Sequence, residues 1–176
     1  MAPLIQELIA AAGVAGRICL GLIFLTAAAQ KFSHWRILPA VIANYRLLPR
    51  RLVAPASALL PPVELILGVT LLAGFAQGWT ALAAMVLLAL FATAMAINLH
   101  RGRSTIDCGC GQSFLKQTLD WSLIARNAVL AALLLPSFGA AAPVSMPILV
   151  AGCSAGLAFA LLYLVTNTIS ALPRSA

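Results

Sequence analysis

Five long apolar stretches constrain this chain more than any other feature of its sequence. They cover residues 8–29, 53–76, 80–99, 121–138 and 148–169. A helix needs roughly 20 apolar residues to cross the hydrocarbon core of a bilayer, and its backbone polar groups must be satisfied within the segment. We therefore predict an all-α polytopic membrane bundle of five transmembrane helices, forming a single integral membrane domain over residues 1–176.

The composition excludes several classes of protein. Hydrophobic residues make up 62% of the chain and charged residues only 9%, too few to coat a soluble enzyme. The net charge of +7 does not indicate nucleic-acid binding, because the basic residues are spread among apolar blocks. The first stretch is expected to be a retained span and not a cleaved signal peptide, since Glu7 precedes it and no Lys or Arg comes before Arg17.

The segment between the first two spans, residues 30–52, is intermediate in polarity. Apolar residues recur at roughly helical spacing and arginines lie between them, which is typical of a helix lying in the membrane interface. Pro39 and Pro49 would bound or bend such a helix. The alternative is an ordinary loop whose arginines extend to the headgroups.

The loop charges predict an orientation. With five spans, one side of the membrane receives nine basic residues and the other side, with the N-terminus and the turn at 77–78, receives none. The nine are Lys31, Arg36, Arg46, Arg50, Arg51, Arg101, Arg103, Lys116 and Arg174. Because basic loops stay in the cytoplasm, we expect a periplasmic N-terminus and a cytoplasmic C-terminus.

The loop after the third span holds the one close cysteine pair, Cys108 and Cys110, separated by Gly109. Two thiols at this spacing can close a small, strained disulfide ring that is easily reduced, so the pair is a candidate for thiol–disulfide exchange. His100 lies at the end of the span before it and could act as a base for a cysteine. The alternatives are two inert cysteines or an irregular metal site that adds His100 and Asp107.

Two further cysteines, Cys19 and Cys153, lie inside the first and last spans. Counted from the non-basic side at about 1.5 Å per residue, they are expected at similar depths. They could form a second dithiol, or they could be buried small apolar residues.

Charges inside the spans are costly and usually mark a structural or functional role. Glu64 follows Pro61 and Pro62, which are expected to break the second helix locally, and Arg126 lies near the start of the fourth span. We predict a Glu64–Arg126 ion pair between these helices. Alternatively, Glu64 could relay protons or line a small-molecule pocket.

Several short motifs occur in order along the chain. They are Gly21, Lys31-Phe32, Tyr45-Arg46-Leu47-Leu48-Pro49, Leu60-Pro61-Pro62-Val63-Glu64-Leu65, Asn98-Leu99-His100-Arg101-Gly102, Asp107-Cys108-Gly109-Cys110 and Arg126-Asn127. Taken together, they resemble the MauE family of methylamine utilisation proteins, within the MauE/DoxX group of redox-associated membrane proteins. The resemblance covers about residues 17–135, and it departs from many members after Cys110, where Gly111-Gln112 replaces Phe-Gly.

The resemblance implies a protein of the bacterial inner membrane that helps to mature the methylamine dehydrogenase small subunit. It implies a thioredoxin-like partner of the MauD type in forming or correcting that subunit's disulfides. Because this client is periplasmic, a cytoplasmic Cys108–Cys110 pair would have to pass electrons outward, with Cys19 and Cys153 as candidate carriers, unless the loop charges mislead.

Two other functions stay open from the sequence alone. The first is a quinone-linked thiol oxidoreductase, with a quinone bound near Glu64 and either Trp35 or Trp121. The second is a non-catalytic membrane anchor or small-solute carrier, for which neither loop cysteine would be needed.

Overall fold

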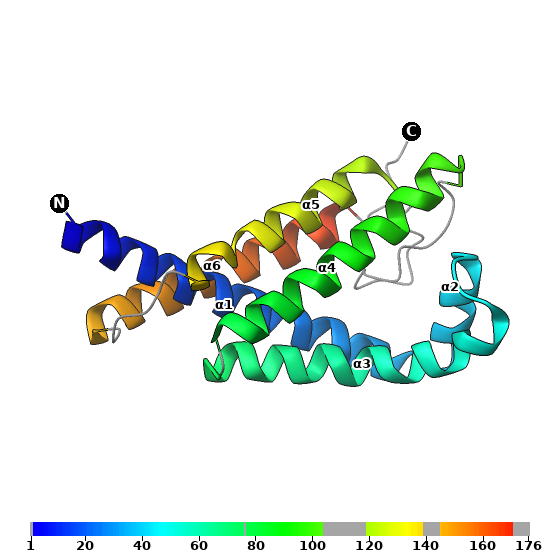
Figure 1. Ribbon diagram of the computed structural model, residues 1–176, viewed down its shortest axis with the longest axis horizontal. Helices are drawn as coiled ribbons and strands as arrows, with labels where there is room; N and C mark the ends of the chain where they lie inside the picture. Colours follow the sequence, from blue (N-terminus) through cyan, green and yellow to red (C-terminus); the bar gives the residue numbers. More distant parts are fainter. Residues whose placement is uncertain (1, 76, 104–118, 139–144, 171–176) are drawn as a thin grey trace.

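The computed structural model describes residues 2–75, 77–103, 119–138 and 145–170, and these are helical with short connections (Figure 1). Five of the helical segments are long and apolar enough to cross a membrane, so the predicted five-span, all-helical architecture is confirmed and fits a multi-pass membrane protein. The elements are α1 (Ala2–Ser33), α2 (Leu38–Asn44), α3 (Arg50–Ala73), α4 (Gln77–His100), α5 (Trp121–Ala132), the short 3-10 helix η1 (Leu135–Phe138) and α6 (Met146–Ser170).

The ends of the observed helices differ from those of the predicted spans. Helix α1 continues to Ser33, and so Lys31, which the sequence places in a basic loop, belongs to the last turn of the first span. Helix α3 begins at Arg50, directly after Pro49, whose extended backbone ends the preceding connection. The predicted break at Pro61 and Pro62 is wrong, because α3 is continuous through both of them. The hydrogen bonds on either side hold the segment helical even though each proline lacks an N–H.

The predicted interfacial segment contains a helix that is shorter than expected. Only Leu38–Asn44 is helical as α2, with Pro39 in its first turn, where the missing N–H costs nothing. After Asn44 the chain turns through Arg46, which has a positive φ of 50°. Helix α2 therefore stands across one end of the bundle instead of continuing α1 (Figure 1).

Helix α1 is the centre of the bundle. It packs most extensively against α6 and α3, and its membrane-spanning window is 61% buried, compared with 17% for α6. Small residues let the backbones approach closely, as is common between helices in lipid. A β-carbon on Gly68 would lie 3.0 Å from the carbonyl oxygen of Gly21, and one on Gly156 would lie 2.6 Å from that of Ala15.

Helices α3 and α4 form a hairpin that opens away from its turn. Gly74 ends α3 with a positive φ of 67°, a conformation that glycine adopts without strain, and its N–H bonds to the carbonyl of Leu71. From this turn the two helices diverge, with α4 packed mainly on α5, and α2 lies at the open end (Figure 1).

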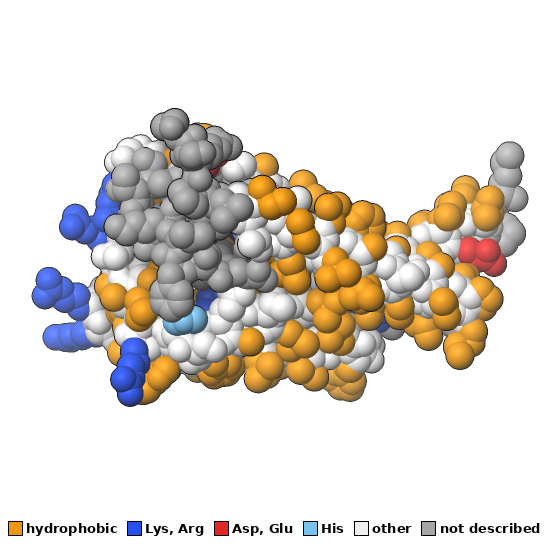
Figure 2. Space-filling model, turned by 180° about the vertical axis from the view of Figure 1, so that it is seen from behind, with side chains coloured by type: hydrophobic (Ala, Val, Ile, Leu, Met, Phe, Trp, Pro, Cys, Tyr) orange, Lys and Arg blue, Asp and Glu red, His pale blue; other side chains and the backbone are white. Residues whose placement is uncertain are grey.

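The basic side chains gather at that same end of the molecule. Figure 2 shows Lys and Arg side chains concentrated at one end and an acidic side chain at the other. Arg36, Arg46, Arg50, Arg51 and Arg101 are exposed at the end formed by α2, the start of α3 and the last turn of α4. The hairpin thus brings the two basic loops to one face, as its topology predicts. Which compartment this face meets stays a prediction.

Candidate functional site

A buried ion pair joins α1 to α3 below the basic end. The Lys31 ammonium lies 2.7 Å from Oε1 and 2.8 Å from Oε2 of Glu64, and both distances are hydrogen bonds. The side chains are 7% and 1% exposed, respectively. Neither charge could remain buried alone at acceptable cost, so each residue accounts for the presence of the other.

The predicted Glu64–Arg126 pair is wrong. Helix α5 packs mainly on α4, and Glu64 is paired with Lys31. The Arg126 Nη1 donates instead to the side-chain carbonyl of Asn167 on α6, and the Arg126 guanidinium lies 5.2 Å from the ring centre of Tyr163. The Arg126 Nε is buried and has no hydrogen-bond acceptor among the described residues. The sequence did carry a signal for the true pair, since Lys31 lies only two residues beyond the predicted end of the first span at residue 29.

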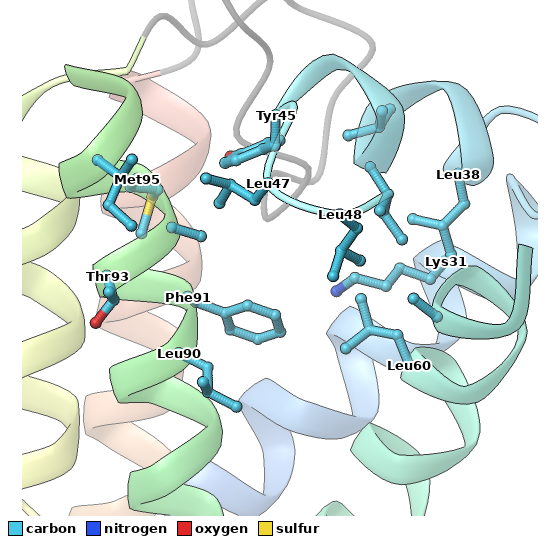
Figure 3. Close-up of a pocket in the computed structure, with 15 residues that line it drawn as sticks. Lys31, Leu38, Tyr45, Leu47, Leu48, Leu60, Leu90, Phe91, Thr93 and Met95 are labelled. Carbon is cyan, nitrogen blue, oxygen red and sulfur yellow. The ribbon is translucent and has the colours of Figure 1, made fainter. Parts of the chain in front are cut away.

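The ion pair borders an apolar cavity of about 490 Å³ at the open end of the α3–α4 hairpin (Figure 3). The walls come from the last turn of α1, from α2 and the turn after it, and from α3 and α4. They are formed by Lys31, Leu38, Val41, Ile42, Tyr45, Leu47, Leu48, Ala56, Leu60, Leu90, Phe91, Thr93, Ala94, Met95 and Ile97. The sequence analysis did not find this cavity, because it depends on the angle between two helices.

Lys31 is the only charged side chain in this lining. Figure 3 shows its nitrogen at the tip of an extended stem that reaches into the cavity between Leu48 and Leu60, on the side facing Phe91. The nitrogen lies 5.7 Å from the centre of the Phe91 ring, within range of a cation–π contact. The cavity is therefore largely apolar, with the Lys31 ammonium as its one charged group among these residues and the hydroxyls of Tyr45 and Thr93 as the other polar side-chain groups.

The predicted redox pair, Cys108 and Cys110, lies outside the described residues. The flanking residues are both held by the bundle at its basic end. On one side, the Arg103 guanidinium donates to Asn98, a fully buried residue whose own amide donates to the carbonyl of Ala94. On the other side, Leu119 is buried in a small core with Met95 and Leu123. The segment that carries the pair thus begins and ends beside the wall of the cavity that α4 forms.

His100 and Trp121 meet between these two anchor points. Their ring centres are 5.3 Å apart with the planes at 82°, an edge-to-face contact between the end of α4 and the start of α5. Asp120 fixes the start of α5 by accepting a hydrogen bond from the Trp121 N–H at 2.7 Å. A role for His100 as a base stays a prediction, since its proposed cysteine partners are not among the described residues.

The quinone position predicted near Glu64 is not completed by either Trp35 or Trp121. Trp35 is exposed beside Arg36, and Trp121 packs on His100. Neither ring contributes to the cavity lining, and Glu64 lies behind Lys31. The aromatic side chain beside the buried pair is instead Phe91, and Tyr45 lines the cavity farther from it.

Cys19 and Cys153 are both free thiols, and Cys19 is fully buried. The helices that carry them are in contact, and Gly156 packs between Ala15 and Ile18 of α1. This register leaves Cys153 about five residues, or about 8 Å, short of Cys19 along the helix axes. The expected similar depth is therefore wrong, and a disulfide between them would require α6 to slide along α1.

The chain is similar to known proteins over most of its length. The family model of methylamine utilisation protein MauE matches residues 8–143. The chain is 39% identical to methylamine utilization protein MauE of Paracoccus denitrificans, over 89% of this chain and 86% of the relative. It is 40% identical to the MauE protein of Methylorubrum extorquens, over 84% and 81% of the two chains. No solved structure matches the chain.

The matched region contains α1 from residue 8 onward and all of α2 to α5. It therefore includes the buried ion pair, the cavity and the segment that carries the cysteine pair. With this coverage and identity, the chain belongs to the MauE family of methylamine utilisation proteins.

Proposed function

We propose that this protein is an inner-membrane accessory for thiol–disulfide exchange in maturing the small subunit of methylamine dehydrogenase. It would act with a thioredoxin-like protein of the MauD type, and Cys108 and Cys110 would be the exchanging pair. The observation that carries the proposal is the Cys-Gly-Cys sequence in a member of this family, in a segment held at both ends by buried residues. His100 and several arginines lie at the same end of the bundle.

The exchange can be written so that its electrons balance. A thiolate of the partner attacks one sulfur of the Cys108–Cys110 disulfide, which forms a mixed disulfide and releases the other cysteine as a thiolate. The partner's second thiol then attacks the mixed disulfide. The partner leaves oxidised, and the pair keeps two electrons as two reduced cysteines. Nearby arginines favour the thiolate forms on which both attacks depend.

Replacing either loop cysteine with serine tests this function. We expect C108S and C110S each to abolish the correctly cross-linked small subunit in cells grown on methylamine, as measured by mass spectrometry of its disulfides. The matched control is Cys153→Ser, which removes a thiol from α6 and should leave the yield unchanged. An undiminished yield in both loop variants would support a non-catalytic anchor and contradict the proposal.

Trapping would identify the partner directly. A chain that keeps only Cys108 cannot resolve a mixed disulfide within itself, so it should accumulate a covalent complex with the thioredoxin-like protein. The corresponding chain that keeps only Cys153 should show none. Non-reducing electrophoresis followed by mass spectrometry reads out both results.

Labelling in intact cells tests the orientation. In a Cys19→Ala/Cys153→Ala background, the loop pair holds the only thiols of the chain. The charge bias predicts that a membrane-impermeant maleimide labels the pair only after the cells are lysed. Labelling from outside would instead place the pair on the side of the periplasmic client.

A further inference from the structure

We propose that the cavity between α2, α3 and α4 binds an uncharged, lipid-soluble ring compound that carries a carbonyl oxygen, the chemistry of a membrane quinone. The site consists of described residues alone. Its role as the electron acceptor for the cysteine pair rests on the proposed function, whereas the binding itself does not.

The size and walls of the cavity select the class of ligand. A volume of about 490 Å³ falls within the roughly 300–1,000 Å³ that small-molecule sites occupy. Most of the lining is aliphatic, as at Leu38 and Leu60, and Phe91 and Tyr45 add two aromatic rings. A charged ligand would lose its hydration without compensation, so an uncharged, apolar molecule is favoured.

The entrance indicates that the ligand comes from the bilayer. Leu90, near the middle of α4, is 60% exposed, and Leu48, in the turn after α2, is 41% exposed, although both line the cavity. Leu90 belongs to a membrane-spanning window, so the cavity borders lipid at this position. A ring with a long apolar tail could occupy the cavity and leave its tail among the acyl chains.

Lys31 supplies the reason to expect a carbonyl. An ammonium group has three N–H donors, and Glu64 accepts two of them. The third makes no hydrogen bond with any residue in the described part of the chain, and Figure 3 shows the nitrogen directed into the cavity. Because Glu64 already neutralises the ammonium charge, the remaining donor suits a neutral oxygen acceptor better than a second anion.

Such a ligand would complete the electron balance of the proposed exchange. The reduced pair holds two electrons and two protons more than its disulfide. When a quinone takes them up, both S–H bonds break, one S–S bond forms, and the two ring carbonyls become hydroxyls. No other oxidant is needed to regenerate the pair.

Binding can be measured with a defined probe. Purified full-length protein in detergent is titrated with decylubiquinone, and native mass spectrometry counts the bound molecules. We expect one saturable site per chain.

Ala94→Trp fills the cavity from α4 and should weaken binding at least tenfold, a loss of the kind expected when the ligand's contacts are removed. Ala83→Trp adds the same ring to the exposed face of α4 and should leave binding unchanged. Equal binding by both variants would overturn the proposal.

A second probe tests the hydrogen bond. Decylbenzene has a ring and a tail but no oxygen, so we expect it to bind about tenfold more weakly than decylubiquinone. In Lys31→Met/Glu64→Leu, which removes both charges together, the difference between the two probes should disappear. Equal affinities in the unmodified protein would show that the cavity holds hydrocarbon, such as a phospholipid tail, and would end the proposal of a carbonyl ligand.

A third variant separates this inference from the proposed function. Cys108→Ser/Cys110→Ser should bind decylubiquinone as tightly as the unmodified protein does, because the proposed contacts are made by the described residues that line the cavity. If binding fails while the loop cysteines prove essential for maturation, the exchange function stands and the cavity inference falls. If binding holds while maturation proceeds without the loop cysteines, the cavity inference stands and the proposed exchange function falls.

Discussion

The two faces of α3 differ sharply in how they meet their neighbours. Toward α1, Gly68 and Gly21 bring the two backbones into direct contact along much of their length. Toward α4, the contact is confined to the region near the hairpin turn, and Leu60 and Phe91 face each other across a cavity. Glycine contacts thus pack α3 tightly against α1, and we call this region of the bundle the closed half. At the basic end, bulky side chains line the cavity between α3 and α4, and we call this region the open half.

The ion pair stands at the boundary between these halves, and breaking it should have the largest effect. Lys31→Met leaves the Glu64 carboxylate buried without its cation, which we expect to cost about 3–5 kcal/mol of the free energy of unfolding. The measurement is a denaturation curve in mixed micelles, followed by circular dichroism.

The double variant Lys31→Met/Glu64→Leu is the control for that experiment. Replacing both charges with apolar side chains of similar size leaves no unpaired charge, so its stability should approach that of the unmodified protein. If the single and double variants are equally unstable, the packing of these side chains matters and their charges do not.

The closed half should be intolerant of a single added methyl group. A β-carbon on Gly16 would collide with the backbone carbonyl of Leu133, which cannot move without displacing the end of α5. We expect Gly16→Ala to cost about 1–3 kcal/mol or more in the same denaturation experiment.

Gly78→Ala is the matched control for the closed half. At Gly78 the nearest atom to an added β-carbon is a ring carbon of Phe138 at 3.9 Å, an ordinary contact. This variant should be as stable as the unmodified protein. Because alanine favours a helix more than glycine does at either position, equal losses at both glycines would show that the loss does not come from close packing around α1.

The number and type of the helices could be predicted from the sequence, because lipid requires long apolar segments and leaves few alternatives. Their ends could not be predicted as well. The apolar content of the sequence predicts that the first span ends at residue 29, but helix α1 continues to Ser33. The buried carboxylate of Glu64 makes a lysine tolerable inside this helix. Pro61 and Pro62 similarly suggested a break that the continuous α3 does not have.

The candidate site could be predicted only in part, because partners depend on which helices touch. Sequence reasoning identified Glu64 and Arg126 as buried groups that need partners, but it could not predict that α5 packs mainly on α4. It therefore paired Glu64 with Arg126. In the structure, the partner of Glu64 is Lys31 and the partner of Arg126 is Asn167. The cavity was beyond sequence reasoning altogether, since its lining comes from four segments that are brought together by the angle between α3 and α4.

The contact between Arg126 and Asn167 should contribute less than the ion pair. It joins α5 to α6, and Asn167→Ala would leave the Arg126 Nη1 without this acceptor. Because Arg126 is only partly buried, we expect a loss of about 1 kcal/mol. Ser154→Ala, which removes an exposed hydroxyl bonded only within α6, is the control and should be neutral. If Asn167→Ala leaves the free energy of unfolding unchanged, the contact between Arg126 and the Tyr163 ring is the one that joins the two helices.

The smallest expected effect gives the sharpest comparison of the two halves. Ala56→Leu adds three carbons to the side of α3 that faces the cavity, where there is room for them, so its free energy of unfolding should change by no more than about 0.5 kcal/mol. Ala81→Leu adds the same atoms on α4 at a fully buried position and should cost about 1–3 kcal/mol. If Ala56→Leu is as costly as Ala81→Leu, the open half is closed in solution, and α2 then lies nearer to α4 than the structure places it.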